Sequence, residues 1–188
     1  VAAIRDKGLA GYLSGIEARD WWYRCDFNWN SAVHANAGTA ALAIRDEEPE
    51  LARRVLEEAC RGLGYLLPSF HPDGGYTEGC MYCDTAIGHL SDFAIPLYRL
   101  TGEDLGLSEH KGLEETLIWH AWMLGRDGRP INFSNCNEST HEWGLTQAFW
   151  WARRFDRPDI AGLQERILRD WRYLPGLFLD VESFWYRE

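Results

Sequence analysis

The sequence lacks a long apolar run and has no excess of positive charge. No stretch approaches the roughly 18 consecutive apolar residues of a transmembrane helix, and the start "VAAIRDKGLAG" lacks the order of a secretory signal peptide. Acidic residues outnumber Lys and Arg, 29 to 19, and the formal net charge is −10. Nucleic acids and anionic membranes are bound mainly through Lys and Arg, so neither is an expected partner. A cytoplasmic location is slightly favoured over a periplasmic or secreted one.

Cysteines are few and odd in number. The five cannot all pair within the chain, and their spacing is not that of a disulfide scaffold, so reduced thiols are expected. An initiator Met is absent too, as expected for a piece of a longer protein. By contrast, the chain is 46% hydrophobic, enough for a real core, and it carries ten Trp, eight Tyr and eight Phe. Such rings build cores and also stack on the faces of sugars.

Acidic turns recur at a regular interval along the chain. The turns "RDEEPEL", "TGEDLGL" and "FDRPDIA" begin at residues 45, 101 and 155, which lie 56 and 54 residues apart. A charged amphipathic stretch follows each turn, and a less charged stretch precedes it. The pattern predicts outer helices after the turns and more buried inner helices after residues 30, 83 and 139.

Helical hairpins repeated at this interval predict an all-α fold, either a solenoid or part of an incomplete α/α toroid. Both architectures need neighbouring hairpins on each side. We therefore interpret residues 1–188 as a single α/α-toroid domain or a fragment of one.

Polar loops precede the three predicted inner helices. Asn28, Tyr82 and Asn135 occupy these loops at intervals of 54 and 53 residues. In a toroid such loops meet at one end of the central cavity, so we expect the three residues to lie around one concavity. The alternative for the polar residues at the helix starts is N-capping. It applies to Ser31, Asp84 and Ser139.

Three motifs resemble those of the heparinase II/III-like polysaccharide lyases. They are "NWN" at 28–30, "PDGGYTEGCMY" at 72–82 and "GRPINFSN" at 128–135, and the resemblance covers roughly residues 20–165. It implies an incomplete α/α toroid that the family follows with a β-sandwich, for which this chain carries no sequence. Since a catalytic His of the family comes from the sandwich, we expect the 188-residue chain alone to be weakly active or inactive.

The chemistry implied is β-elimination in a uronate-containing polysaccharide or oligosaccharide. An enzyme of this class must hydrogen-bond the uronate carboxylate and stabilise an enolate-like intermediate. Asn28, Asn30 and His34 have suitable side chains, although a lone His on a helix of small residues is often only a satisfied interior group. The resemblance places Tyr82 as the residue that transfers protons.

Further polar and aromatic residues are predicted to contact the substrate. Neither a cofactor nor a metal ion is expected. Glu78 has the alternative of holding its loop through backbone N–H groups, and a tight turn is favoured for Asp73. The predicted substrate-binding residues are Trp29, Glu78, Asn132, Asn135, His141 and Trp143.

Three alternatives to a lyase remain open from the sequence. An α/α-barrel glycoside hydrolase would pair Glu78 with Glu138 or Glu142 across the scissile bond. A zinc site would combine the Cys80-x-x-Cys83 pair with Cys136 and His141, against packing thiols as the default. A non-catalytic glycan-binding or scaffold domain would use the aromatic loops for stacking alone. If residues 1–188 are a fragment, the remainder of the longer chain is a further expected partner.

Overall fold

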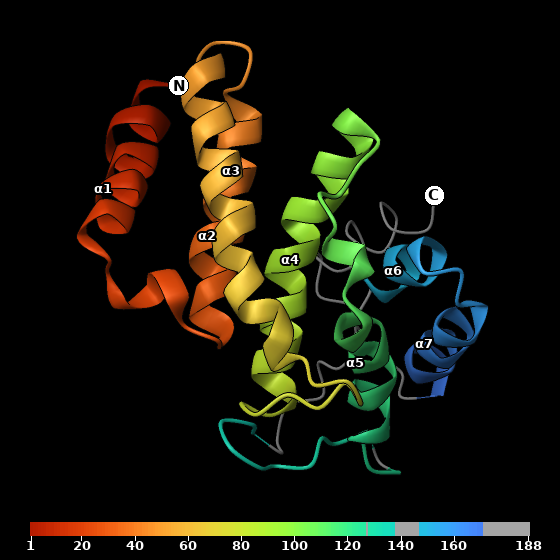
Figure 1. Ribbon diagram of the computed structural model, residues 1–188. Helices are drawn as coiled ribbons and strands as arrows, with labels where there is room; N and C mark the ends of the chain where they lie inside the picture. The colour runs from red at the N-terminus through yellow and green to blue at the C-terminus, as the bar shows by residue number, and fades with distance from the viewer. Residues whose placement is uncertain (127, 138–146, 171–188) are drawn as a thin grey trace. The chain divides into compact units, whose positions relative to one another are not determined.

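Every regular element that the structure describes is a helix, so the all-α prediction is confirmed. The computed structural model describes residues 1–126, 128–137 and 147–170, which form the helices of Figure 1 and one isolated bridge between Leu124 and Pro130. None of these helices is both long and apolar enough to cross a bilayer. The helices are α1 (Ala10–Ala18), α2 (Asn28–Ala43), α3 (Pro49–Leu66), α4 (Cys80–Thr101), α5 (Lys111–Trp122), α6 (Ala148–Arg154) and α7 (Pro158–Asp170), with π or 3₁₀ turns η1 (Ile4–Leu9), η2 (Trp21–Arg24), η3 (Leu67–Ser69) and η4 (Leu107–Glu109).

The chain divides into two compact units. Unit 1 contains residues 1–69 and 89–107, and unit 2 contains residues 70–88 together with the residues from 108 onward. Helix α4 contributes to both, because its first turns belong to unit 2 and the rest to unit 1. The prediction of a single toroid domain stays a prediction.

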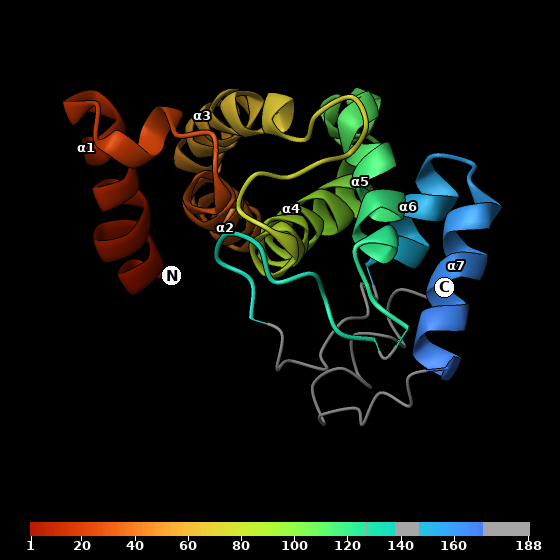
Figure 2. The same ribbon diagram turned by 90° about the horizontal axis from the view of Figure 1, so that it is seen from below.

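Helices α2 and α3 form the antiparallel hairpin at the centre of unit 1, and Figures 1 and 2 both show them side by side. The amide of Asn30 at the start of α2 donates to the carbonyl of Gly62 near the end of α3, at 3.1 Å. At the opposite end, Ala41 of α2 and Val55 of α3 belong to one buried apolar cluster, which also takes in Leu9. The close approach of the two helices depends on Gly62, which lies against the imidazole of His34.

Helix α4 lies beside α2 within unit 1 and runs in the same general direction. Ser31 lies 3.5 Å from the His89 ring, and eight residues further along α2 the Thr39 hydroxyl donates to the Asp92 carbonyl at 3.1 Å. Inner helices of successive hairpins are expected to run in parallel in this way, because an outer helix returns the chain between them.

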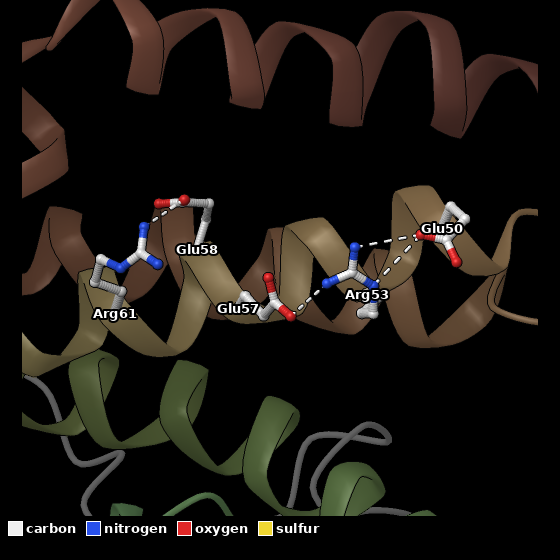
Figure 3. A network of polar contacts seen from close by, with 5 residues as sticks. All are labelled: Glu50, Arg53, Glu57, Glu58 and Arg61. Carbon is white, nitrogen blue, oxygen red and sulfur yellow. Dashed lines mark hydrogen bonds and ion pairs between the residues drawn. The ribbon is translucent and has the colours of Figure 1, made fainter.

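Helix α3 is amphipathic, as predicted for an outer helix. Its buried positions include Ala52, Val55, Ala59 and Leu63. The exposed side carries ion pairs at helical spacing: Arg53 binds Glu50 and Glu57 at 3.3 and 2.6 Å, and Arg61 binds Glu58 (Figure 3). Because water screens exposed pairs, the buried face of α3 stabilises the hairpin more than these contacts do.

Unit 2 is built on α5, α6 and α7. Arg157, directly before α7, binds Glu114 of α5 and pairs with Asp159 at 2.8 Å. Within α6, Trp151 is fully buried and stacks on Phe155, with ring centroids 5.5 Å apart. The loop that begins unit 2 is attached to α5 because the Thr116 hydroxyl donates to the Gly74 carbonyl. The described helices α3, α5 and α7 all follow acidic turns, as the repeat predicted.

The helix starts differ from the predicted ones. Helix α2 begins at Asn28 rather than after residue 30, and α4 begins at Cys80. Phe27, in an extended conformation with φ −135°, precedes α2 and gives no side-chain cap. The N-capping alternative is therefore wrong for Ser31 and for Asp84, both of which lie inside helices. Ser139 lies outside the described residues.

Replacing Gly62 by Ala is expected to destabilise unit 1. An added Cβ would clash with the imidazole ring of His34, which is itself fully buried. We expect a loss of about 1–3 kcal/mol in the free energy of unfolding. The matched control is Gly64→Ala two residues along α3, where an added Cβ meets no atom within 4 Å. That change is expected to stabilise the helix by roughly 0.5–1 kcal/mol. Denaturant titration measures both, and equal effects would contradict the proposed contact.

Candidate functional site

The first turn of α2 holds two of the predicted amides in the interior of unit 1. Asn30 is fully buried; its amide nitrogen donates to Gly62, while its buried side-chain oxygen has no hydrogen-bond partner among the described residues. Asn28 is 7% exposed, and its backbone carbonyl accepts from the Ser31 hydroxyl at 2.8 Å. Trp29, between the two amides, is 52% exposed. The turn therefore directs its amides inward and its indole outward.

His34 is buried with both ring nitrogens bonded. The Tyr23 carbonyl lies 3.1 Å from Nε2, and because a carbonyl only accepts, Nε2 carries the proton. Nδ1 then accepts from the Tyr12 hydroxyl at 2.7 Å. Burial lowers the pKa of His34 to about 4, since the imidazolium loses its hydration there. A neutral ring with both nitrogens engaged supports the structural alternative for His34 over a direct contact with substrate.

Tyr82 lies in the first turn of α4 and is half-buried. Its hydroxyl makes no hydrogen bond to any of the described residues. The preceding Gly79 has φ +85°, a left-handed conformation that glycine adopts without strain, and it packs against the Phe133 carbonyl and Cys136. Close packing of this entry turn places Tyr82 on a fixed backbone and leaves its hydroxyl available to a ligand.

The loop before α4 is ordered by its own polar contacts. The Asp73 carboxylate accepts from the Gly75 N–H at 3.1 Å, which is the tight turn favoured from the sequence. Tyr76 is buried and stacks on Phe70, and its hydroxyl donates to Glu78 at 3.2 Å. Tyr76 thus restrains the carboxylate of Glu78 from within the loop.

A second loop of unit 2 joins this one through the backbone. The Asn135 N–H donates to the Glu78 carbonyl at 3.3 Å, so these two predicted residues lie together. Asn132 and Asn135 are both exposed. Exposed amides therefore lie on a loop that is hydrogen-bonded to the turn leading into α4.

The predicted site residues fall into two groups. Asn28, Trp29, Asn30 and His34 belong to unit 1, whereas Glu78, Tyr82, Asn132 and Asn135 belong to unit 2. His141 and Trp143 lie outside the described residues. The expectation that all of these surround one concavity stays a prediction.

The thiols behave as packed side chains. Burial is the main cause that raises the pKa of Cys80 to about 12, and the neighbouring Cys136 thiol adds to it. Burial also raises the pKa of Cys60 to about 11 and that of Cys83 well above the ordinary range. Among the described residues, no three His, Cys, Asp or Glu side chains gather as a metal site requires. His141, the fourth ligand of the zinc alternative, lies outside them.

Each unit carries a cavity that the predicted residues do not line. The one in unit 1 is about 410 Å³ and lies between α1 and α2, beside Tyr12, Asp20, Trp22 and Asn36. The one in unit 2 is about 700 Å³ and lies between α5 and α7, beside the exposed Trp122. Tyr82 lines neither of these two cavities.

Sequence reasoning missed one cluster of exposed rings in unit 1. Trp21 is 62% exposed, stacks on Phe27 and meets Trp29 edge-on. The signal available in the sequence was "WWYR" at 21–24, in which Trp and Arg lie three residues apart. Arg24 is exposed, and its guanidinium lies over the rings of Tyr23 and Tyr65.

Comparison with known proteins assigns no family to the chain. No family model matches it, and no curated protein matches it significantly. Membership of the heparinase II/III-like lyases stays a prediction carried by the motifs.

The buried histidines are expected to make stability fall as the pH is lowered. Burial lowers the pKa of both His34 and His120 to about 4, against about 6.5 for an exposed histidine. Between these values the unfolded chain binds protons that the folded chain does not, so the stability present above pH 6.5 is lost towards pH 4. Each such proton contributes a slope of about 1.4 kcal/mol per pH unit.

The measurement is the free energy of unfolding at several pH values between 7 and 4. His34→Gln is expected to show a shallower slope than the unaltered chain, whatever its absolute stability. His71→Gln, at an exposed position, is the control and is expected to keep the original slope. A slope unchanged by His34→Gln would show that His34 is not buried in the neutral form.

Proposed function

We propose that the chain belongs to a polysaccharide lyase that cleaves uronate-containing glycans by β-elimination, with Tyr82 transferring the protons. The observation that carries the proposal is the half-buried Tyr82 hydroxyl, which has no hydrogen-bond partner among the described residues. It stands in the first turn of a long helix, and the turn before it is closely packed. A positioned hydroxyl that is open to a ligand suits general acid–base catalysis.

The reaction balances with one tyrosine. Tyr82 as phenolate removes the proton from C5 of the uronate, and the C5–H electrons form the C4–C5 double bond. The C4–O bond breaks, and its electrons go to the leaving glycosidic oxygen. The Tyr82 phenol then gives the proton to that oxygen, so the phenolate returns and no water is consumed.

The uronate carboxylate needs hydrogen-bond donors while charge develops on it. In unit 2 the exposed amide of Asn135 is suited to this role, because its backbone is bonded to the turn that leads into α4. The burial of Asn30 and His34 supports an indirect role for both, in which they hold α2 in place. Of the sequence-predicted catalytic set, the proposal keeps Tyr82 as the reacting residue.

A non-catalytic glycan-binding domain is the second candidate. The exposed rings of Trp21 and Trp29 favour it, since stacking on sugar requires no chemistry. The glycoside hydrolase alternative depends on Glu138 or Glu142, which lie outside the described residues. Products separate these candidates, because only elimination creates a double bond that absorbs in the near ultraviolet.

Tyr82→Phe is expected to abolish β-elimination without weakening glycan binding. Loss of the hydroxyl removes the proton-transfer group, which is worth roughly 10²–10⁴-fold in rate. The assay incubates the 188-residue chain at high concentration with uronate polymers for hours and follows unsaturated product, because low activity is expected. The control is Tyr98→Phe, a half-buried tyrosine near the other end of α4 that should keep the original rate.

Three results would count against a lyase with Tyr82 as its proton-transferring residue. Equal rates for Tyr82→Phe and the unaltered chain would remove the tyrosine from the mechanism. New reducing ends without unsaturated product would favour the hydrolase. Glycan binding with no product of either kind, from the 188-residue chain and from a full-length protein that contains it, would favour the non-catalytic domain.

A further inference from the structure

We propose that unit 1 carries a separate binding subsite for an acidic saccharide, formed by an aromatic platform and one arginine. The aromatic platform consists of Trp21, Phe27 and Trp29, and the arginine is Arg24. One pyranose ring would lie on the exposed indoles while its carboxylate binds the guanidinium. The uronate ligand class rests on the proposed function, whereas the subsite itself requires no catalysis.

The rings of the platform hold one another in place. Trp21 and Phe27 are nearly parallel, with an interplanar angle of 12° and centroids 6.0 Å apart, which is an offset stack. Trp29 meets Trp21 at 73° with centroids 5.8 Å apart. Despite these contacts Trp21 stays 62% exposed and Trp29 52% exposed. Flat apolar surface that is both fixed and exposed is suited to the C–H face of a sugar.

The base beneath the platform is rigid. Trp29 belongs to the first turn of α2, and the neighbouring Asn30 is tied to Gly62 of α3. Trp21 belongs to η2, where the Tyr23 carbonyl of the same turn binds the buried His34 ring. A ligand would therefore lose little affinity to ordering the platform, because the rings are already positioned.

Arg24 is placed to bind a negatively charged group of a ligand on the platform. Residues three apart in a 3₁₀ turn lie one above the other, so Trp21 and Arg24 share one face of η2. The Arg24 guanidinium carbon is 5.6 Å from the Tyr23 ring centroid and 5.3 Å from that of Tyr65. Stacking on these rings restrains the side chain and leaves its N–H groups for an acceptor.

Charge complementarity points to an anionic ligand. Arg24 makes no ion pair with a carboxylate of the described residues, although the chain carries 29 acidic side chains and a net charge of −10. A planar guanidinium binds a carboxylate through two parallel hydrogen bonds. A single exposed cation beside neutral rings matches a glycan with isolated carboxylates better than a densely sulfated one.

The test is calorimetric titration of the 188-residue chain with a 4-linked uronate tetrasaccharide and with its carboxyl-reduced form. Trp21→Ala and Trp29→Ala are each expected to weaken binding of both sugars by at least about fivefold, as for residues at the centre of an interface. Arg24→Gln is expected to weaken binding of the acidic sugar by about tenfold and to leave binding of the reduced sugar unchanged. Arg24→Lys, which keeps the charge, should bind the acidic sugar better than Arg24→Gln.

The matched control is Trp122→Ala in unit 2, because Trp122 is even more exposed, at 78%. It should bind both sugars as the unaltered chain does. Circular dichroism and the unfolding midpoint confirm that each variant is folded. The proposal is overturned if the unaltered chain binds neither sugar, if both platform variants bind normally, or if Trp122→Ala weakens binding equally. It is also overturned if Arg24→Gln affects the two sugars alike.

The outcome is separable from that of the lyase proposal. Tyr82→Phe should bind the tetrasaccharide like the unaltered chain. Platform-dependent binding, with no unsaturated product from the chain or from a full-length protein that contains it, would exclude the lyase proposal and keep the subsite. Normal turnover, together with unchanged binding by Trp21→Ala and Trp29→Ala, would exclude the subsite and keep the lyase proposal.

Discussion

Unit 1 depends on one buried imidazole. His34 joins three segments of the chain, because it accepts from Tyr12 of α1, donates to the Tyr23 carbonyl of η2 and fills the space above Gly62 of α3. The two hydrogen bonds together require the neutral tautomer with the proton on Nε2, because Nδ1 must be unprotonated to accept from Tyr12. The aromatic rings of Tyr12, Trp22 and Tyr23 surround the imidazole edge-on and complete its enclosure. The positions of η2 and of the first turn of α2, and therefore of the exposed tryptophans, follow from this contact.

The motif "NWN" forms the first turn of the helix that carries His34. Asn28 and Asn30 are both buried, although about 200° of helical rotation separates them, and Trp29 between them is exposed. The Asn30 amide donates to the Gly62 carbonyl between α2 and α3, and the indole of Trp29 joins the platform. The hydrogen-bonding capacity of the motif thus serves to fix the backbone from which an aromatic ring is presented to a ligand.

Sequence periodicity predicted the helices better than their ends. The outer helices were recognised because charged and apolar residues alternate at helical spacing, as in α3 and α7. The starts of α2 and α4 were placed too late, since the preceding residues Phe27 and Gly79 have no polar side chain that would indicate a cap. Burial of His34 was an alternative from the sequence, but its partners could not be predicted, because Tyr12 and Tyr23 come from a helix and a turn that no repeat indicated. Trp21 was overlooked for the same reason.

Partial or full burial of the Cys60 and Cys80 thiols affects how they react with alkylating reagents. Thiolates react with alkylating reagents far faster than thiols do, and burial raises the pKa of Cys60 to about 11 and that of Cys80 to about 12. At neutral pH the buried Cys80 sulfur reacts while its helix is open to water, whereas Cys60 is only half-buried and is partly accessible in the folded state. Cys60 lies on α3 in unit 1 and Cys80 at the start of α4 in unit 2. The modification rate of Cys80 therefore reports openings at the start of α4 in unit 2.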